Sequence, residues 1–444
     1  MRTGRPAALA RSVIAGAARQ YECQCAEYRH DHATTETRHA RQFGTTAEFA
    51  YGWADMARST SVRRFENHPS RRAFLGATAT VVAAGLTAGC ESDSAQPGRL
   101  DTPASTTPVP PTGPYQAGIT LPRQAQPNLL AVVADVADGV AVGPLLAELG
   151  EAVGTLTAGT DTRLLGLSPG DLTVTIGVGP RLVRMADPSL PGTTELPEFS
   201  RERIAPQARG GDLLIQVCAG DAVVIPIVAA ALLHQAGDRI HERWRQSGRR
   251  GSTIPVAPGL TAPRNVFGFI DGIVGPHTAA EQERDLWLAG PSPVTRGTIA
   301  VLRRMELDLP RFTALPVATQ EAVFGRRRDT GTPLSGGAIA SDPDLGAKTP
   351  DGRYLIPADA HMRRAHPNTV GVGLMLRRSY NIDEPAPGLL FISFQNDIRT
   401  FTNTLTRMDN GDALLPFTTT TASASFLILP GFDRQHPLGA TLFR

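Results

Sequence analysis

Cysteine and aromatic residues are scarce in this 444-residue chain, which has four cysteines and only 6% aromatic side chains. Cys23, Cys25 and Cys90 lie in the first 90 residues, so the remainder of the chain holds Cys218 alone. A single thiol cannot form an internal disulfide, which excludes a disulfide-stapled fold. Cys218 stands in the apolar run LLIQVCAG and is expected to be a small, buried core residue.

Several functional signatures are also missing. The chain has no dinucleotide-binding fingerprint, no phosphate loop and no serine-hydrolase nucleophile elbow. Its formal net charge is +2, but residues 1–90 hold 12 arginines against 7 acidic residues, so the rest of the chain is mildly acidic. This balance gives no support to a nucleic-acid partner.

The N-terminal region has the features of an export signal. Residues 70–75, SRRAFL, have the form of a twin-arginine signal and precede an apolar, small-residue run that ends at Cys90. That run is too short and too weakly apolar for a membrane span, so the sequence predicts export to an extracytoplasmic location. LTAGC (86–90) is similar to a lipoprotein cleavage box, with Thr87 where an aliphatic residue is usual. The alternatives are lipidation of Cys90, which would anchor the protein to a membrane, and cleavage without lipidation.

These signals divide the chain into segments. Met56 would begin a conventional signal peptide, so residues 1–55 are interpreted as an over-long, unstructured gene start and residues 56–90 as the signal peptide. Residues 91–114 are rich in Ser, Thr and Pro and predict a linker. Two domains are predicted beyond the linker, at residues 115–290 and 291–444.

Short apolar runs bounded by Gly, Pro or Asp predict strands, and longer stretches with helical spacing predict helices. The predicted strands are 129–136, 172–178, 213–219, 297–303 and 389–395. The predicted helices are 140–155, 222–246 and 397–409. The element order before residue 250 recurs weakly after residue 295, which indicates two α+β halves, each an antiparallel sheet with helices on one face.

The stretch NVFGFIDGIVGP (265–276) places one acid, Asp271, among apolar residues at a glycine corner. Asp-Gly is a favoured hairpin-turn dipeptide, so a plain turn is one interpretation. The other interpretation is a carboxylate that apolar surroundings prepare for acid–base catalysis. The stretch alone is compatible with both.

Eight segments in a fixed order carry a resemblance to a known family. They are YQAGI (115–119), DLTVTIGVGP (171–180), LPEF (196–199), GGDLLIQVCAGD (210–221), GFIDG (268–272), AHMRRAHP (360–367), LRRSY (376–380) and GLLFISFQND (388–397). From about Tyr115 to the C-terminus the chain resembles the dye-decolourising peroxidases, in particular their exported branch related to iron-uptake haem peroxidases. The resemblance implies an α+β fold of two ferredoxin-like domains, with one b-type haem held mainly by the second domain.

The resemblance also implies roles for the loop around Asp271. This aspartate would lie above the haem iron and transfer a proton, and Gly272, Ile273 and Val274 would contact the haem. The loop departs from the family pattern at Ile273, where Thr is common, and at Gly275, where Asn is common.

Haem iron needs a neutral imidazole as its axial ligand. By chemistry alone His361 and His366 compete, but the family motif places the ligand at the first histidine, so His361 is expected to bind the iron. The segment His366-Pro367-Asn368 would then run along the haem edge. Arg377 matches the distal arginine of the family, expected both to contact the haem and to stabilise negative charge during catalysis.

Two further expectations concern the surroundings of the haem. Leu390 or Phe391, together with Phe394, is expected to supply an apolar lining, and core strand is the favoured description for at least some of these residues. Trp287 and Tyr380 are expected to be surface aromatics that pass electrons from bulky donors.

The implied function is haem-dependent reduction of hydrogen peroxide through a ferryl intermediate, with oxidation of dye-like or phenolic one-electron donors. One alternative is an envelope haem-binding protein that releases iron, similar to a deferrochelatase of an iron-uptake system. The other is a non-catalytic envelope lipoprotein, since a fold does not guarantee activity. The expected partners are hydrogen peroxide, an unidentified electron donor and iron-uptake components, and a homo-oligomer is compatible with the sequence.

Overall fold

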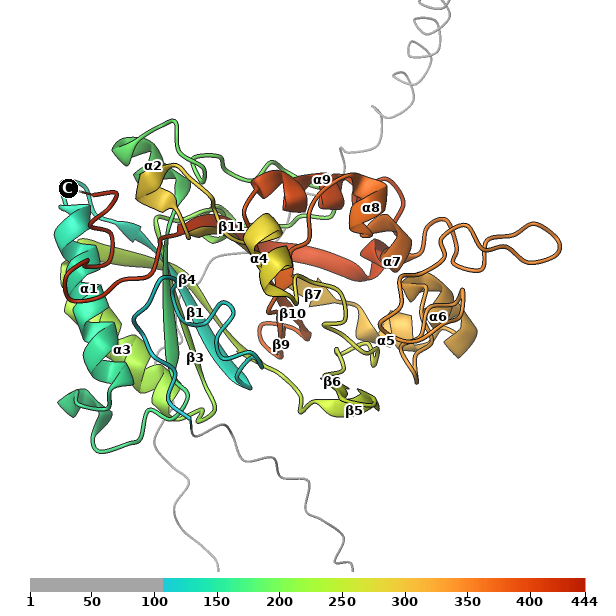
Figure 1. Cartoon of the computed structure of the whole chain (residues 1–444), viewed down its shortest axis with the longest axis horizontal. Helices are drawn as coiled ribbons and strands as arrows, with labels where there is room; N and C mark the ends of the chain where they lie inside the picture. Colours follow the sequence, from blue (N-terminus) through green and yellow to red (C-terminus); the bar gives the residue numbers. More distant parts are fainter. Residues whose placement is uncertain (1–106, 444) are drawn as a thin grey trace, which may run out of the picture. The chain divides into compact units, whose positions relative to one another are not determined.

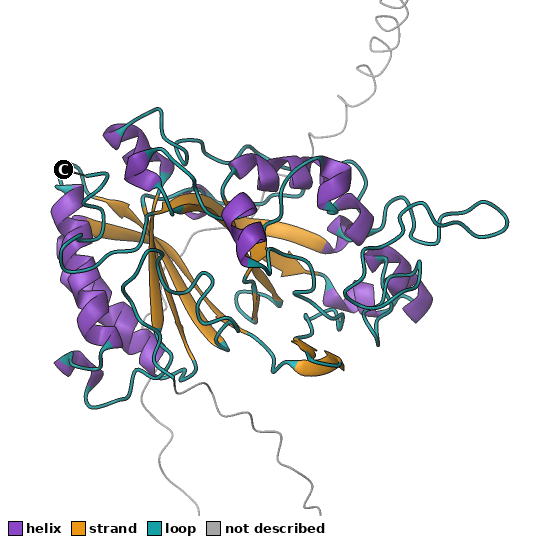
Figure 2. Ribbon diagram, viewed as in Figure 1, coloured by secondary structure: helices purple, strands orange, loops and turns teal. Residues whose placement is uncertain are grey.

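The computed structural model describes residues 107–443, in which antiparallel strands and helices alternate (Figures 1 and 2). The predicted gene start, the signal peptide with Cys90 and most of the predicted linker lie outside these residues. The predicted domain boundary at residue 290 stays a prediction.

The first half of the sheet has four antiparallel strands. They are β1 (Asn128–Val136), β2 (Thr173–Val178), β3 (Leu213–Ala219) and β4 (Ile240–Arg249). Their spatial order is β2-β3-β1-β4. β1 pairs with β3 from Asn128 opposite Ala219 to Ala134 opposite Leu213.

Two long helices cover the outer face of this half. They are α1 (Val142–Thr157) and α3 (Val224–Ala236), which lie along one side of the strands in Figure 1. In α1, Leu145, Leu149 and Leu156 recur at helical spacing and are fully buried against outward-facing strand residues such as Val132 and Ile215. The sequence β1-α1-β2-β3-α3-β4 gives the βαββαβ order of a ferredoxin-like domain.

The second half repeats this arrangement with longer insertions. Its strands are β7 (Thr298–Leu307), β8 (Leu376–Arg377), β9 (Tyr380–Ile382), β10 (Gly388–Gln395) and β11 (Thr418–Ile428). β7 lies between β11 and β10, and the other edge of β10 pairs with β8 and β9. β10 pairs with β7 from Gly388 opposite Glu306 to Gln395 opposite Ile299.

The two halves join at both edges, so that the strands form a closed ring. At one edge β4 pairs with β9 through Arg249 and Asn381. At the other edge β11 pairs with β2 through Leu427 opposite Val178 and Ile428 opposite Gly177. Inward-facing side chains of both halves, among them Val133, Leu302, Ile392 and Phe426, form one buried inner cluster between the sheets. The predicted α+β class with two ferredoxin-like halves is confirmed.

The remaining elements are short. They are α2 (Pro180–Ala186), β5 (Ile254–Ala257), β6 (Leu260–Ala262), α4 (Ala279–Asp285), α5 (Leu309–Thr313), α6 (Val317–Phe324), α7 (His361–Arg364), α8 (Pro367–Val370) and α9 (Ile398–Asp409). α9 packs on β10, and α7 and α8 pack on α9 (Figure 1). Among residues 107–443 no helix combines the length and apolarity that crossing a membrane requires.

The predicted helix 222–246 is wrong in its second part. α3 ends at Ala236, where Gly237 has a positive φ of 57°, and the chain returns as β4. Trp244 and Gln246 are buried while their neighbours are exposed or half-buried, which is the period-two alternation of a strand. The prediction also missed β11, which begins with four threonines and does not form an apolar run.

Candidate active site

The candidate site lies on the outer face of the second half of the sheet. Arg377 of β8 pairs with Ser393 of β10, and Leu376 pairs with Phe394. Directly opposed residues point to the same face of the sheet. Arg377 therefore lies on the same face as Ser393, whereas Leu376 and Phe394 lie on the opposite face. Phe391, two residues from Ser393, contacts Phe401 of α9 with ring centroids 5.7 Å apart. Arg377 is therefore on the side that α9 covers.

Only one of the residues expected to line the site is on this face. Leu390 and Phe394 are fully buried in the inner cluster, on the other side of β10. Because side chains alternate along a strand, Phe391 faces the Arg377 side instead. Leu390 and Phe394 are therefore core residues of the strand, which is the alternative description, and Phe394 does not line the site. Phe391 lies on the expected face, and its contact with a haem stays a prediction.

His361 begins α7 and forms a buried pair with Asp412. The His361 Nδ1 atom lies 2.8 Å from Asp412 Oδ2, and the Asp412 side chain is 0% exposed. An ionised carboxylate can only accept, so Nδ1 carries the proton and donates it to this hydrogen bond. The other carboxylate oxygen accepts from Leu414 N at 2.8 Å. This arrangement leaves His361 Nε2 with a free lone pair, as a metal-binding histidine requires.

The electrostatics of His361 follow from these neighbours. Burial alone lowers the pKa of His361, but the charge and hydrogen bond of Asp412 outweigh it, so the pKa is raised. The positive charge of Arg377 lowers the pKa of His361, and the negative charge of Asp271 raises it. Arg377 and Asp271 therefore each lie close enough to His361 to act on its imidazole. The His361 side chain is still 31% exposed, so its free nitrogen is accessible.

Asp271 does not form the turn of a hairpin. The turn in this stretch lies earlier, where Asn265 N donates to Phe269 O at 2.9 Å. Asp271 follows Ile270, and its Oδ1 accepts from Gly272 N at 2.7 Å. The Asp271 side chain is thus held by its own loop and not by the geometry of a two-residue hairpin.

A cluster of phenylalanines connects the Asp271 loop to α7. Phe269 stacks on Phe324 of α6, with ring centroids 3.9 Å apart and an interplanar angle of 13°. Phe324 in turn meets the imidazole of His361 edge-on, with centroids 6.0 Å apart. The loop that carries Asp271 and the helix that carries His361 therefore pack against the same ring.

Two arginines beside these residues, Arg326 and Arg377, have no carboxylate partner among residues 107–443. The Arg326 guanidinium donates to the carbonyls of Gly331 (2.7 Å) and Ile339 (3.1 Å), and its pKa is lowered by burial and by the nearby charge of Arg377. His366 Nδ1 is buried and has no hydrogen-bond partner among residues 107–443. Burial lowers the pKa of His366, Asp342 raises it and Arg326 lowers it further.

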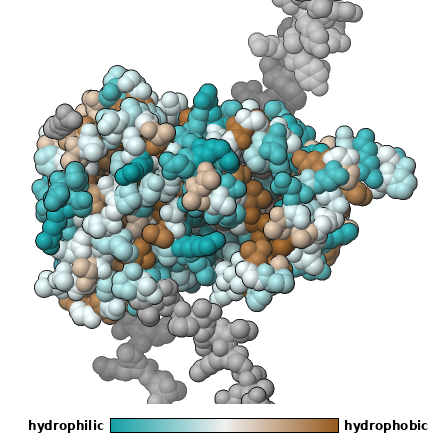
Figure 3. Space-filling view, in the orientation of Figure 1, coloured by the Kyte–Doolittle hydropathy of each residue, from teal (hydrophilic) through white to brown (hydrophobic). Residues whose placement is uncertain are grey.

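This donor set fits a haem. A single imidazole suits the axial position of a metal whose other ligands come from a macrocycle. The cations Arg326 and Arg377 and the unpartnered His366 Nδ1 suit the carboxylate groups of such a cofactor. Apolar residues also gather on this side of the molecule, over the region where Figure 1 places β7 and α7 (Figure 3).

The other predicted haem contacts lie in the loop after Asp271 and in the first turn of α8. Gly272 is exposed and Val274 is 38% exposed, while the carbonyl of Ile273 lies 3.0 Å from His277 Nε2. Pro367 begins α8 and Asn368 is exposed. Their roles toward a haem stay predictions.

The two expected surface aromatics are not at the surface. Trp287 is 4% exposed and Tyr380 2% exposed, and both belong to the inner cluster. Trp287 stacks on the half-buried Tyr115 with centroids 4.0 Å apart, and the Tyr380 hydroxyl lies 3.7 Å from Cys218 Sγ. The expectation was wrong because period-two alternation directs Tyr380 inward.

Asp412 is the functional residue that sequence reasoning missed. It lies 51 positions beyond His361, in the segment NGDALLPF after α9. A single acid after a predicted helix carries no signal of its own. The available hint was chemical, because a metal-binding histidine commonly donates its second ring N–H to a carboxylate.

The two ferredoxin-like halves define the haem peroxidase class together with the site: a carboxylate-oriented histidine, an arginine on the outer face of the second half, and an aspartate in a loop that packs against the same phenylalanines as the histidine. Comparison with known proteins makes the assignment specific. Residues 116–250 match the family described as Dyp-type peroxidase, N-terminal, and residues 262–433 match Dyp-type peroxidase, C-terminal. The chain belongs to the Dyp-type peroxidase family.

Individual relatives agree with this assignment. A dye-decolorizing peroxidase of Thermobifida fusca is 34% identical over 288 residues, which cover 59% of this chain and 65% of that protein. A deferrochelatase of Shigella sonnei is 27% identical over 415 residues, covering 85% of this chain and 98% of that protein. The crystal structure of a DyP-type peroxidase from Cellulomonas bogoriensis superposes with a TM-score of 0.69 at 32% identity, covering 77% of this chain and 99% of that chain.

Proposed function

We propose that the chain is a peroxidase that binds one b-type haem through His361 and reduces hydrogen peroxide at the expense of one-electron donors. The observation that carries the proposal is the 2.8 Å pair of His361 and Asp412, together with the charges of Arg377 and Asp271 that act on the same imidazole. Family membership supports it independently.

The haem, when bound, supplies the iron that takes up peroxide and the oxidising equivalents that are passed to the donors. His361 and Asp412 would hold and orient the haem. In the neutral ring Asp412 keeps the single proton on His361 Nδ1, so that the lone pair is on Nε2, the nitrogen that would bind the metal. The hydrogen bond also raises the basicity of the ring, which strengthens it as a ligand.

Asp271 and Arg377 would act on the hydrogen peroxide that the haem binds. The Asp271 carboxylate would accept a proton from one oxygen of hydrogen peroxide and return it to the other oxygen, which leaves as water. A bound haem would take up the remaining oxygen and supply the two electrons that this cleavage requires. The Arg377 guanidinium is permanently charged and stabilises the negative charge that develops while the O–O bond breaks. Both groups need to be positioned before peroxide arrives, and the packed Phe269–Phe324 pair and the β8–β10 pairing provide that rigidity.

The direct test is a visible absorption spectrum of the purified, haem-loaded protein before and after addition of hydrogen peroxide, followed by oxidation of a phenolic donor. The expected result is a Soret band that shifts on peroxide addition and returns when the donor is added. A protein that takes up no haem would instead support the non-catalytic lipoprotein.

A second candidate function is release of iron from haem, which the long alignment to a deferrochelatase favours. The same His361 would bind the haem in both functions. The experiment incubates haem-loaded protein without peroxide and follows porphyrin fluorescence, which appears only when iron leaves the ring. Fluorescence that grows with time would favour iron release, and a stable Soret band would favour the peroxidase.

We further propose that the protein is exported by the twin-arginine pathway and acts outside the cytoplasm, where lipidation of Cys90 would tether it. The support is the order of Arg71-Arg72, the apolar run and Cys90 in the sequence. Replacing both arginines by lysine should retain the precursor in the cytoplasm. Radiolabelled fatty acid should be incorporated into the wild type and not into Cys90→Ala.

A further inference from the structure

A second group of cations lies between the helices that follow the site. Residues of α7, α8 and α9 line a cavity of about 370 Å³. Its charged residues are Arg364 and Arg407, its other polar residues are Thr369, Asn403, Thr406 and Asn410, and no acidic residue lines it. The side chains of Arg364 and Arg407 therefore place two positive charges in this cavity, and no carboxylate in its lining balances them.

Neither arginine is satisfied by the protein. Among residues 107–443 neither guanidinium forms an ion pair or donates a hydrogen bond, and the Nε atoms of Arg364 and Arg407 are both buried without an acceptor. A buried donor without an acceptor destabilises the folded protein, because it has lost its hydrogen bonds to water. An external acceptor would remove this cost and the repulsion between the two cations.

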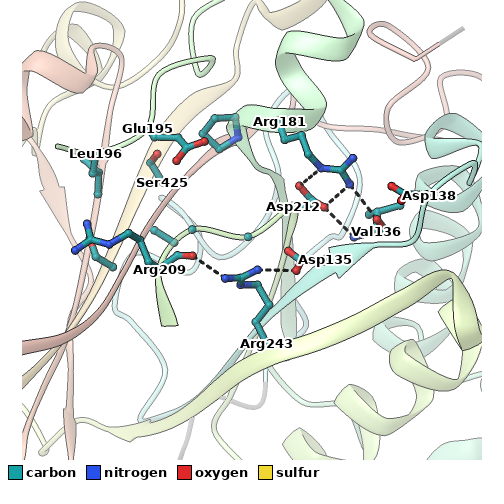
Figure 4. Close-up of a pocket in the computed structure, with 15 residues that line it drawn as sticks. Asp135, Val136, Asp138, Arg181, Glu195, Leu196, Arg209, Asp212, Arg243 and Ser425 are labelled. Atoms are coloured by element: carbon teal, nitrogen blue, oxygen red, sulfur yellow. Dashed lines mark hydrogen bonds and ion pairs between the residues drawn. The ribbon is translucent and has the colours of Figure 1, made fainter. Parts of the chain in front are cut away.

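Another cavity, larger than this one, shows the opposite arrangement (Figure 4). It has a volume of about 440 Å³ and shares no residue with the active site. Its three arginines already have carboxylate partners: Arg181 meets Asp212 at 2.5 Å, Arg209 meets Glu202 at 2.9 Å and Arg243 meets Asp135 at 2.6 Å. That cavity offers no free cation to an anion, whereas the cavity between α7, α8 and α9 offers two.

The groups around the smaller cavity indicate which anion fits. Thr369 Oγ1 already donates to backbone carbonyls and Asn410 Nδ2 donates to Thr406 O, so the free donors are the two guanidinium groups, the Asn403 amide and the Thr406 hydroxyl. Donors on several sides match a tetrahedral oxyanion, which presents acceptor oxygens in several directions. We propose that Arg364 and Arg407 bind a phosphate group in this cavity, between α7–α8 and α9.

The position of this phosphate site gives it a structural consequence. Arg364 is in α7, which His361 begins, and Arg407 is in α9, three residues before Asn410 and the turn to Asp412. A β-carbon placed on Gly411 would lie 3.4 Å from Arg364 Nη2, so this guanidinium packs against the residue that precedes Asp412. A phosphate held by both arginines bridges α7, which carries His361, and α9, which leads into the turn at Asp412. It therefore stabilises the pairing of His361 with Asp412.

The proposal does not rest on the haem reaction, so its test uses the stability of the folded protein. Haem-loaded protein is heated in potassium phosphate and in potassium chloride of equal ionic strength. A ligand that binds only the folded state raises the melting temperature with its concentration. The expected result is a melting temperature that rises with phosphate and not with chloride.

Matched variants assign the effect to the two arginines. Arg364→Gln and Arg407→Gln should each weaken phosphate binding by about tenfold or more in titration calorimetry, because a charge-assisted hydrogen bond is worth about 1.5–3 kcal/mol. Arg399→Gln is the control, since Arg399 is also in α9 but is paired with Asp397. Phosphate binding that is equal in the wild type and in the double variant Arg364→Gln/Arg407→Gln would overturn the proposal.

A second arm identifies the source of the phosphate group. Phosphatidylcholine vesicles with and without phosphatidic acid are mixed with the wild type and the double variant and separated by flotation. Arginine-dependent flotation with phosphatidic acid, without binding of inorganic phosphate, would assign a lipid headgroup. Binding of inorganic phosphate without flotation would assign a soluble phosphate, and no binding in either arm would overturn the proposal.

Discussion

The two halves of the sheet share a strand order but differ in what covers their outer faces. In the first half, α1 and α3 cover the strands with apolar side chains such as Leu145 and Leu149, which are fully buried. In the second half, short helices and long loops cover the strands, and charged residues such as Arg377 and His361 remain partly exposed. The outer face of the first half is therefore closed by an apolar core, whereas the outer face of the second half is accessible to a ligand.

This difference shows how one topology serves two purposes. A face sealed by apolar side chains contributes stability and leaves no group free for chemistry. A face that keeps unpaired cations, such as Arg326 and Arg377, gives up part of that stability and gains a place for an anionic cofactor. Function on this fold is therefore determined by the cover over the second sheet and not by the strand order.

The largest expected effect is the loss of haem binding in His361→Ala, because this change removes the only nitrogen that Asp412 orients. The variant should show no Soret band after reconstitution with haem. His366→Ala is the control and should retain most of the band, since its ring nitrogen is expected to contact the haem edge only. The reverse pattern in the two absorption spectra would transfer the ligand role to His366.

Arg377→Leu should leave the haem in place and slow its reaction with peroxide. One electrostatic donor at a developing anion is commonly worth roughly 10²–10³-fold in rate. Stopped-flow absorbance after mixing with hydrogen peroxide measures this rate. The double variant with Asp271→Asn should lose much less than the product of the single effects, because both residues act on one step. Fully multiplicative effects would show that they act separately.

Asp412→Asn should have a smaller effect, because the asparagine carbonyl still accepts from His361 Nδ1 but carries no charge. Loss of such a partner typically costs about 10–100-fold in affinity or activity. Transfer of haem to excess apomyoglobin should accordingly be faster by about that factor. Asp409→Asn is a matched control, since Asp409 is hydrogen-bonded to Ser200 and not to His361. Equal transfer rates in the two variants would remove Asp412 from the site.

A change in the closed half should have the smallest effect on the site. Leu149 is fully buried under the first sheet, so Leu149→Ala should lower the free energy of unfolding by about 2–5 kcal/mol. Denaturant titration measures this loss. The Soret band and the peroxide rate of the folded variant should equal those of the wild type, and a change in either would show that the halves are coupled.

The spacing of apolar residues was sufficient to predict most strands of the sheet. The runs that became β1, β3 and β10 alternate or are continuously apolar, and their bounds are reproduced to within a residue. β11 could not be found in this way, because its Thr and Ser residues pack against a partner strand that is distant in sequence. The helix at 222–246 was extended too far because Trp244 fits helical spacing as well as strand alternation.

Site residues could be predicted from the sequence only where they belong to a short local motif. His361, Asp271 and Arg377 each stand in a short recognisable segment, and the structure brings their charges together. Asp412 is supplied by a distant turn, and the face of Phe394 depends on strand register, which no local pattern encodes.

The central claim is that the open half carries a carboxylate that moves a proton, and Asp271→Asn tests it most directly. Asparagine keeps the shape of the side chain and should leave the Soret band of the resting protein unchanged. Because a general acid–base residue typically contributes ~10²–10⁴-fold, the reaction with hydrogen peroxide in the stopped-flow instrument should slow by about that factor. A variant that reacts at the wild-type rate would show that Asp271 is only a loop residue and would contradict the account.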